Sequence, residues 1–263
     1  MNVICFASEK GGSGKTTCAV NLGAALAQSG QKILLLDMDS QGSLTHHFSQ
    51  ECDGVGGNIV DLLEGRISLQ TAITECKSQV HFIASTRQLS EYGNQDFREQ
   101  LTKILAEVRK NYDYVFLDFP PMLSDFTVGL LSVADQVIVP VEGRGGLSIR
   151  GLHSQIETVN LVQERLNARL KISGIIVCRL VERMKLCQEI AQYLAANHRE
   201  VAYQTAIRES IKIAEAASVG KSIFSYSPRS APAKDFLALA QEFLKRQEEK
   251  NPPKARLRRR NSS

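Results

Sequence analysis

The sequence lacks the features of exported, membrane-spanning and metal-binding chains. No positively charged leader precedes the first apolar stretch, and no apolar run approaches the roughly 18 residues of a membrane-spanning helix. None of the six cysteines lies in a C-x-x-C pair or another metal-binding spacing. We therefore expect free thiols in a reducing cytosol and a soluble, cytoplasmic protein. No segment of about 20 to 50 residues recurs, which argues against a repeat architecture.

Acidic residues are missing from positions 251–263, which hold five cations: Lys254, Arg256, Arg258, Arg259 and Arg260. Residues 1–250 carry 27 basic and 28 acidic side chains, so the formal charge of +4 belongs to a tail and not to a basic body. With 263 residues, 43% of them hydrophobic, the chain can bury a substantial core. We expect one α/β domain over 1–250 and a disordered basic tail over 251–263.

A glycine-rich segment at 9–17 (EKGGSGKTT) follows a short apolar run at 3–7 and precedes a helix-forming run at 18–28. A strand, loop and helix in this order form a phosphate cradle, because glycines let successive backbone N–H groups face one point at the positive end of the helix. Lys15 is placed to reach the outer phosphates, and the hydroxyl of Thr16 to hold Mg²⁺. The candidate nucleotide-binding residues are Lys10, Gly11, Gly12, Ser13, Gly14, Lys15, Thr16 and Thr17.

The loop departs from the usual pattern G-x-x-x-x-G-K-[ST], because Glu9 occupies the first glycine position and an extra lysine, Lys10, precedes the glycines. The resulting K-G-G-x-G-K-T resembles the deviant Walker A ATPases that include ParA, Soj and MinD. This resemblance implies ATP and Mg²⁺ as cofactors. It also implies that Lys10 reaches across a nucleotide-sandwich homodimer to the phosphates held by the partner subunit. The implied catalytic residues are Lys10, Lys15 and Asp39.

Two further apolar runs, 32–37 and 114–118, end in acids, as strands of a parallel sheet buried on both faces would. The first leads into Asp39 and Gln41, which resembles the family's D-x-D-P-Q without its proline. The second leads into two prolines, as in the family's D-x-P-P. Because active groups gather at the carboxyl ends of parallel strands, we expect these acids beside the P-loop. The resemblance implies that Asp39 orients the attacking water. The implied metal residues are Thr16, Asp37 and Asp118.

Strand and helix patterns alternate along the chain, which predicts an α/β fold with a doubly wound, mostly parallel sheet and helices on both faces. We expect helices over 16–29, 96–111, 152–166, 185–197 and 233–250, and a loop over 143–151. In the last helix we expect an apolar stripe of Phe236, Leu237, Ala240, Phe243 and Leu244. The adjacent histidines His46 and His47 point in different directions without a third ligand nearby, so we expect a solvated pair.

Residues 213–222 (IAEAASVGKS) resemble the family's L-x-E-A-P-S-x-G-K segment, with Ala217 in place of its proline. Arg208 replaces the proline of the I-P-R stretch whose backbone helps to hold adenine in the family. Specificity for adenine therefore follows from the resemblance and not from these residues.

The leading interpretation is a ParA-like partition ATPase, closest to the short Soj-like proteins. The resemblance implies an ATP-bound dimer that binds DNA non-specifically on the nucleoid, and a ParB-like or adaptor partner that triggers hydrolysis. Its cargo would be a plasmid, a chromosome origin or a protein assembly. By alignment with Soj-like relatives, Arg183 and Lys212 fall at DNA-contacting positions, and Lys221 could add to them.

Two other classes stay open. A MinD-like ATPase would insert a C-terminal amphipathic segment into a membrane, but residues 254–263 contain one large apolar residue, Leu257, among five cations. We therefore expect no stable membrane association. The other class is a metabolic P-loop enzyme, such as a synthetase acting on a small acid. Only the D-x-P-P and E-A-x-S-x-G-K segments argue against it, because they resemble those of partition ATPases better. An electron donor of the nitrogenase iron-protein type would need cysteines after Asp118, and positions 119–135 contain none.

Overall fold

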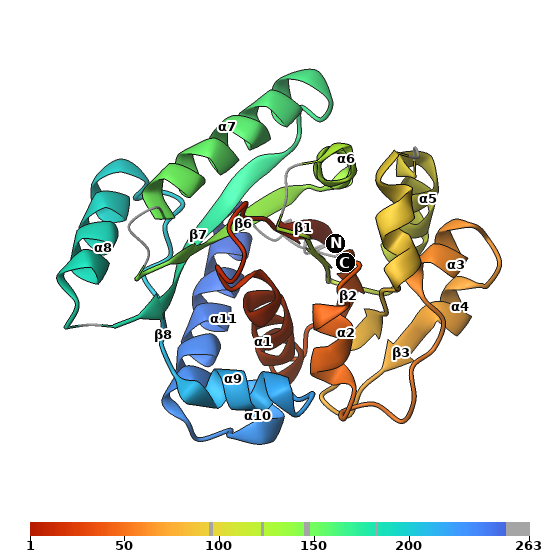
Figure 1. Ribbon diagram of the computed structural model, residues 1–263, viewed down its shortest axis with the longest axis horizontal. Helices are drawn as coiled ribbons and strands as arrows, with labels where there is room; N and C mark the ends of the chain where they lie inside the picture. Colours follow the sequence, from red (N-terminus) through yellow and green to blue (C-terminus); the bar gives the residue numbers. More distant parts are fainter. Residues whose placement is uncertain (95–96, 122–123, 145–147, 182, 251–263) are drawn as a thin grey trace, which may run out of the picture.

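The computed structural model describes residues 1–94, 97–121, 124–144, 148–181 and 183–250, and its described part is built around one eight-stranded sheet (Figure 1). The strand order is β3-β4-β2-β5-β1-β6-β7-β8, and every pair is parallel except β3 with β4. Strand β1 therefore lies where the order changes direction, which is the place where doubly wound sheets bind ligands. The strands are β1 (Asn2–Phe6), β2 (Ile33–Asp37), β3 (Ile73–Glu75), β4 (His81–Ile83), β5 (Tyr114–Asp118), β6 (Gln136–Glu142), β7 (Lys171–Leu180) and β8 (Ile207–Arg208).

Apolar side chains of the strands divide between the two faces of the sheet, because successive residues of a strand point in opposite directions. In β1, Val3 and Cys5 join the core on one face, whereas Ile4 and Phe6 join the core on the other. All four are fully buried. Burial on both faces explains why the strands read as continuous apolar runs instead of alternating ones.

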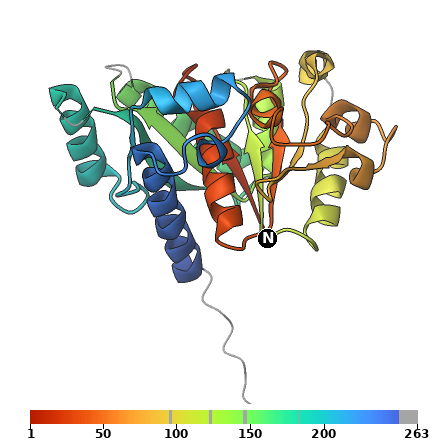
Figure 2. The ribbon, with the colours of Figure 1, turned by 90° about the horizontal axis from the view of Figure 1, so that it is seen from below.

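Helices cover both faces of the sheet (Figures 1 and 2). Those with residues in the core beside Ile4 and Phe6 are α1 (Lys15–Gln28), α2 (Ser43–Phe48), α9 (Ile211–Ser218), α10 (Ile223–Tyr226) and α11 (Ala231–Lys250). Those in the core beside Val3 and Cys5 are α3 (Ile59–Leu63), α4 (Leu69–Ala72), the 3₁₀ helix η1 (Arg87–Asn94), α5 (Arg98–Val108), α6 (Asp125–Val133), α7 (Ser148–Arg165) and α8 (Lys185–Asn197). This three-layer arrangement confirms the predicted doubly wound α/β fold.

Most helix predictions are confirmed to within a few residues, and α8 has the predicted bounds. Helix α7 begins at Ser148, so the loop predicted over 143–151 is too long at its end. The division into a domain at 1–250 and a tail at 251–263 stays a prediction, because the tail lies outside the described residues.

Two further predictions are wrong in part. In the apolar stripe of α11, Phe236, Ala240 and Phe243 are buried as predicted, but Leu237 is 36% exposed and the fully buried leucine is Leu239. Cys52 and Cys76 form a disulfide and are not free thiols, because an antiparallel bridge places them opposite each other with their Cα atoms 4.4 Å apart. The other four cysteines are free and buried, as expected for them: Cys5, Cys18, Cys178 and Cys187.

Candidate nucleotide-binding site

The P-loop joins the end of β1 to the start of α1, and two of its glycines have backbone conformations that other residues rarely adopt. The φ angle is +74° at Gly12 and +104° at Gly14. A side-chain carbon on Gly14 would also lie 3.2 Å from the sulfur of Cys178, a tight contact that would force Cys178 to shift by a few tenths of an ångström. Helix α1 begins directly afterwards at Lys15, so its unpaired N–H groups and positive end face the loop.

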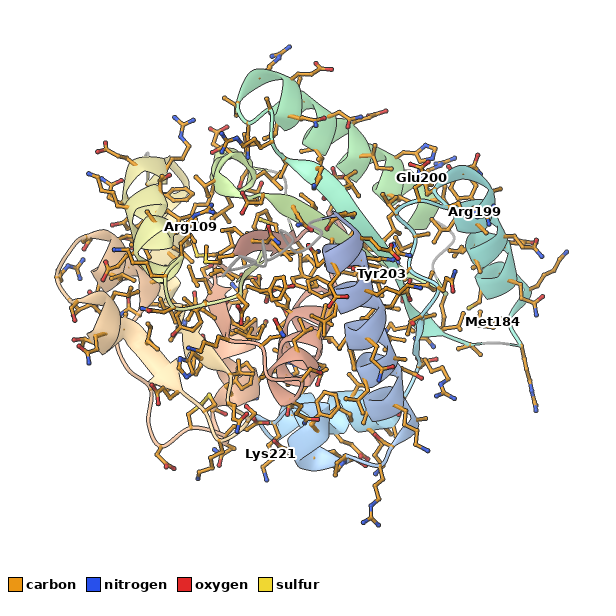
Figure 3. The ribbon with its side chains drawn as sticks, turned by 180° about the vertical axis from the view of Figure 1, so that it is seen from behind. Arg109, Met184, Arg199, Glu200, Tyr203 and Lys221 are labelled. Atoms are coloured by element: carbon orange, nitrogen blue, oxygen red, sulfur yellow. A yellow bond between two sulfur atoms is a disulfide. The ribbon has the colours of Figure 1, made fainter. Side chains whose placement is uncertain are left out.

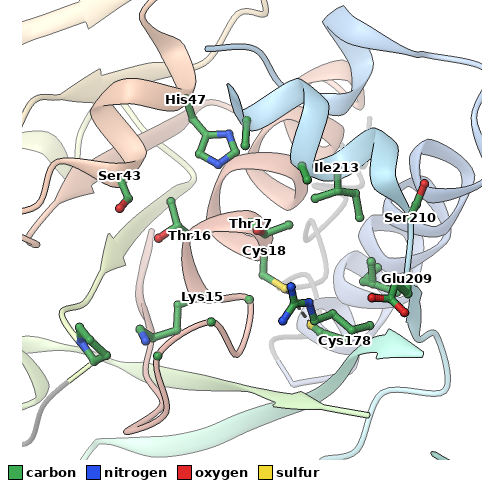
Figure 4. Close-up of a pocket in the computed structure, with 18 of the residues that line it drawn as sticks. Lys15, Thr16, Thr17, Cys18, Ser43, His47, Cys178, Glu209, Ser210 and Ile213 are labelled. Atoms are coloured by element: carbon green, nitrogen blue, oxygen red, sulfur yellow. Dashed lines mark hydrogen bonds between the residues drawn. The ribbon is translucent and has the colours of Figure 1, made fainter. Parts of the chain in front are cut away.

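A cleft of about 830 Å³ opens above the P-loop, at the carboxyl edge of the sheet (Figure 4). Its floor contains P-loop residues and the first turn of α1, and its walls come from the loops after β2 and β5 and from residues 207–217. Of the predicted site residues, Gly11, Gly12, Gly14, Lys15, Thr16, Thr17 and Asp39 line this cleft. Ser13, Asp37 and Asp118 are buried beside it. The structure therefore brings together motifs that lie about 200 residues apart in the sequence.

Asp118, at the end of β5, is fully buried beside Thr16. Oγ1 of Thr16 donates to Oδ2 of Asp118 at 2.6 Å, while Oδ1 has no hydrogen-bond partner among the described residues. Burial and the nearby Asp37 raise the pKa of Asp118 to about 8, although the Thr16 hydroxyl and Lys15 oppose the shift. A buried carboxylate oxygen without a partner, next to a hydroxyl, fits a hydrated Mg²⁺, which prefers oxygen ligands and keeps several waters.

Asp37 has a different environment from Asp118, although the two lie side by side on paired strands. Its Oδ2 accepts hydrogen bonds from the backbone N–H and the hydroxyl of Thr45, at 2.8 and 2.7 Å. Its Oδ1 accepts from the N–H of Asp39 at 3.2 Å. Burial raises the pKa of Asp37 to about 6, and these hydrogen bonds limit the rise. Asp37 thus orders the loop that carries Asp39, and its predicted role toward the metal stays a prediction.

Two lysines flank the glycines of the P-loop in unlike surroundings. Lys15 is buried, which lowers its pKa, and its Nζ donates to the backbone carbonyl of Lys10 at 3.4 Å. The side chain of Lys10 is 41% exposed and forms an ion pair with Glu142, at the end of β6. Glu142 also pairs with Arg179 at 3.3 Å, and the hydrogen bond from Lys10 holds the pKa of Glu142 below its usual range. Lys15 therefore lines the cleft, whereas Lys10 is not among its lining residues.

The far end of the cleft is lined by apolar side chains of α9 and by residues at the end of β8. The guanidinium group of Arg208 is held by Asp235 on α11. It donates to both carboxylate oxygens of Asp235, to one of them at 2.6 Å. The backbone N–H of Arg208 donates to the same carboxylate at 3.1 Å. The arginine that replaces the family's proline is thus fixed to α11, which holds the segment after β8 against the cleft.

Two of the predicted DNA-binding residues, Arg183 and Lys221, lie apart, and the third, Lys212, has an acidic partner (Figure 3). Arg183 is exposed in the turn before α8, next to Met184. Lys221 lies in the turn between α9 and α10, well away from Met184 in Figure 3. Lys212 on α9 pairs with Glu215 at 2.8 Å, and that hydrogen bond raises its pKa. A single subunit therefore presents separated cations, one of which already has an acidic partner.

Sequence reasoning missed three residues of the site. Glu142 could have been found, because it is the last residue of a buried strand, as Asp37 and Asp118 are. Arg179, which lines the cleft at φ +56°, gave no signal in the sequence. The prediction of a solvated histidine pair is wrong for His47, because only 7% of this residue is exposed and it lines the cleft.

The glycine loop, the buried Lys15, the paired Thr16 and Asp118, and the parallel sheet define a P-loop nucleoside triphosphatase with an extra lysine before its glycines. Residues 1–172 match the model of a family described as AAA domain. The chain is 35% identical to the sporulation initiation inhibitor protein Soj of Bacillus subtilis, over 91% of this chain and 97% of Soj. It is 34% identical to the chromosome-partitioning ATPase Soj of Treponema pallidum, over 92% of this chain and 97% of that protein.

Among solved structures, the septum site-determining protein MinD of Pyrococcus horikoshii, in complex with Mg-ADP, matches with a TM-score of 0.77 and 25% identity. The match covers 95% of this chain and 99% of MinD. The chain therefore belongs to the ParA and Soj family of deviant Walker A ATPases. No helix in the described part of the chain is both long and apolar enough to cross a membrane.

Proposed function

We propose that this chain is a partition ATPase of the ParA type, which binds DNA as an ATP-bound homodimer and releases it after hydrolysis stimulated by a ParB-like or adaptor protein. The observation that carries the proposal is the similarity to the two Soj proteins along at least 91% of the chain. Its cargo would be a plasmid, a chromosome or a protein assembly, and the protein would act in the cytoplasm on the nucleoid.

The cleft of this chain binds ATP with Mg²⁺, as its donor set fits and as the Mg-ADP complex of MinD supports. The metal ion neutralises charge on the phosphates when it is bound. Thr16 and Asp118 hold it, and Lys15 contacts the outer phosphates from the floor of the cleft. Asp39 orients the attacking water, from a loop that is fixed by hydrogen bonds from Gln41 and Ser85 to Asp39 at 3.0 and 2.6 Å.

DNA binding by this chain requires a local patch, because residues 1–250 carry 27 basic and 28 acidic side chains. Lys221 lies well away from Met184, the neighbour of Arg183, on one subunit (Figure 3), and Glu215 already partners Lys212. A dimer would present each of these cations twice without changing its surroundings. Dependence on ATP would then follow from geometry, since ATP joins the subunits.

The test is binding to random-sequence duplex DNA with ATP, with ADP and without nucleotide, over a range of salt. We expect binding with ATP only, no preference for sequence, and a log–log salt slope of about −0.9 per neutralised phosphate. Arg183→Ala and Lys221→Ala should each make the salt slope less steep. The expected change is about one for every phosphate that is no longer neutralised. A chain ending at Lys250 should keep its ATP dependence.

A matched control is Lys103→Ala, because Lys103 on α5 pairs with Glu99 at helical spacing just as Lys212 on α9 pairs with Glu215. It should bind DNA as the wild type does, while Lys212→Ala should bind more weakly. Tight binding that does not depend on the nucleotide and is lost only when residues 251–263 are removed would contradict the proposal. It would show that a polycationic tail alone binds DNA.

A further inference from the structure

Arg179 has a backbone conformation that is unusual for its place in the structure. Its φ angle is +56°, in the left-handed region that residues other than glycine rarely adopt. Among the described residues, Gln79 is the one other such case. Gln79 belongs to the turn that joins β3 to β4, where its N–H donates to the carbonyl of Cys76 at 2.9 Å. Arg179 lies within β7, so a turn does not account for its conformation.

The cause is a bulge in β7 at Arg179. Cys178 pairs with Ile207 and Leu180 pairs with Arg208 on β8, so Arg179 is one extra residue between them. Cys178 is buried in the core that contains α1, whereas Leu180 packs against the core on the opposite face of the sheet. Residues two apart in a regular strand share a face, so the extra residue interrupts the alternation. Bulges of this kind re-aim a side chain and are common next to active sites.

The bulge places the side chain of Arg179 beside the P-loop. Arg179 lines the nucleotide cleft, and a side-chain carbon on Gly12 would lie 4.0 Å from its Nη1. The preceding residue, Cys178, lies against the start of α1, with its sulfur 3.4 Å from that of Cys18 (Figure 4). The side chain of Arg179 is 48% exposed, so a ligand in the cleft can reach it.

The guanidinium group of Arg179 has donors to spare for such a ligand. Its Nη1 donates to Oε1 of Glu142 at 3.3 Å, and its remaining N–H groups make no hydrogen bond to a described residue. A guanidinium group has five N–H donors and no acceptor. Glu142 also pairs with Lys10, so two cations share this one carboxylate. The carboxylate therefore leaves one positive charge beside the P-loop that it does not neutralise.

Phosphate oxygens are the ligand groups that this arrangement fits. The N–H groups of the P-loop and the positive end of α1 bind a polyphosphate beside Gly12, which is where the guanidinium group lies. A guanidinium group can donate to phosphate oxygens with several N–H groups at once, and its charge strengthens each bond. The nucleoside carries no anionic group, so it would use the donors of Arg179 but not its charge.

We propose that Arg179 contacts the polyphosphate of the bound nucleotide, because the bulge in β7 aims its guanidinium group at the P-loop. Nη1 remains with Glu142, while the other N–H groups donate to phosphate oxygens. Arg179 thus adds a cation from β7 to Lys15 at the start of α1. The proposal rests on nucleotide binding alone, and it is independent of the proposed role in partition.

The experiment measures the affinity of purified protein by calorimetry for Mg-ADP and for magnesium pyrophosphate, which has phosphates but no nucleoside. Arg179→Ala should bind both about tenfold more weakly, since it loses charge-assisted hydrogen bonds that are partly exposed to water. Arg179→Lys should lie between Arg179→Ala and the wild type, because lysine keeps the charge but loses the planar fork. Unchanged affinities in Arg179→Ala would overturn the proposal. A loss for ADP alone would also overturn it, because it would place Arg179 at the nucleoside.

Arg179→Gly separates the side chain from the backbone. Glycine adopts a φ of +56° without strain, so this variant should be at least as stable as Arg179→Ala when nucleotide is absent. It should nevertheless bind both ligands as weakly as Arg179→Ala does, and wild-type affinity in Arg179→Gly would refute a side-chain contact. Arg66→Ala is the matched control, because Arg66 also pairs with an acid, Asp61, its side chain is 52% exposed and it does not line the cleft. Its affinities should equal those of the wild type.

A final comparison separates a contact with phosphate from an effect through Glu142. Without Arg179, the carboxylate of Glu142 would be less well neutralised and would itself repel phosphate. This repulsion is absent in a Glu142→Gln background, so a direct contact predicts that Arg179→Ala still weakens pyrophosphate binding there by about the same factor. If Arg179→Ala has no effect in that background, the proposal fails, because Arg179 would serve only to neutralise Glu142.

Discussion

Asp37 and Asp118 show at the level of single residues how a site can be fitted to a ligand at the cost of stability. They lie in register on neighbouring strands, and both are fully buried. Burial and Asp37 raise the pKa of Asp118 to about 8, and burial raises the pKa of Asp37 to about 6. A cation in the cleft would relieve this crowding, which is why crowded carboxyl groups of this kind accumulate at binding sites.

This crowding predicts that Asp118→Asn stabilises the nucleotide-free protein, and more so at pH 8 than at pH 5. Between its unfolded pKa near 4 and its folded pKa of about 8, Asp118 holds more proton in the folded state. The stability of the wild type therefore falls as the pH rises through this range, and asparagine removes the loss while still accepting from Thr16. We expect a gain on the order of 1–2 kcal/mol at pH 8.

Urea denaturation without nucleotide at both pH values measures this gain. Asp53→Asn is the control, because Asp53 is an exposed acid that does not line the cleft, and it should change neither value. A gain for Asp118→Asn that is equal at pH 5 and pH 8 would show that the carboxyl group is not protonated in the folded protein.

Site residues that belong to motifs with a fixed spacing could be predicted from the sequence. Residues that belong to the site only because of how the folded chain packs could not. Thr16 and Asp118 could be paired from the sequence, because a strand that ends in an acid must meet the P-loop in a parallel sheet. The burial of His47 could not be predicted, because it depends on how α2 packs against α9.

At the level of elements, helix α11 shows that a predicted helix can have a different buried face from the expected one. The sequence predicts the helix correctly, but with Leu237 on its apolar stripe, whereas the buried positions are spaced as Ala233, Phe236, Leu239 or Ala240, and Phe243. Two leucines two residues apart cannot both face the sheet, since they are about 200° apart around a helix. The rest of the core decides between them, and the sequence pattern alone does not.

We therefore expect Leu239→Ala and Leu237→Ala to differ strongly in stability. Leu239 is fully buried in the core that contains α1, so truncation should cost about 2–4 kcal/mol through reduced burial and a cavity. Leu237 is 36% exposed, so its truncation should cost less than about 1 kcal/mol. Chemical denaturation of the two variants tests this, and equal losses would mean that the helix is rotated relative to this structure.

Elements were predicted better than the links between them. Most strands and helices follow from the spacing of apolar residues, and α8 starts and ends where predicted. The disulfide between Cys52 and Cys76 could not be predicted, because 24 residues separate the cysteines and only the pairing near β3 brings them opposite each other.

Lys10 is the residue through which we expect one subunit to act on the other in an ATP-bound dimer. In the single subunit it pairs with Glu142 and does not line the cleft, whereas Lys15 does. Its side chain is 41% exposed, so it could serve a second subunit if it left Glu142. Arg179 already shares that carboxylate, so Glu142 would keep a cationic partner after Lys10 moved away.

The last prediction is that Lys10→Ala removes ATP-dependent dimerisation or hydrolysis while leaving nucleotide binding by the monomer largely unchanged. A lysine that reaches phosphates across an interface neutralises charge there, as an arginine finger does, so its loss should act only on the joined state. Sedimentation with a non-hydrolysable ATP analogue measures the dimer, and calorimetry with ADP measures monomer binding. Lys77→Ala is the control, because Lys77 also pairs with an acid, Asp53, but on an exposed surface away from the cleft. An unaltered dimer fraction together with full ATPase activity in Lys10→Ala would refute action in trans, and Lys10 would then be a residue of its own subunit alone.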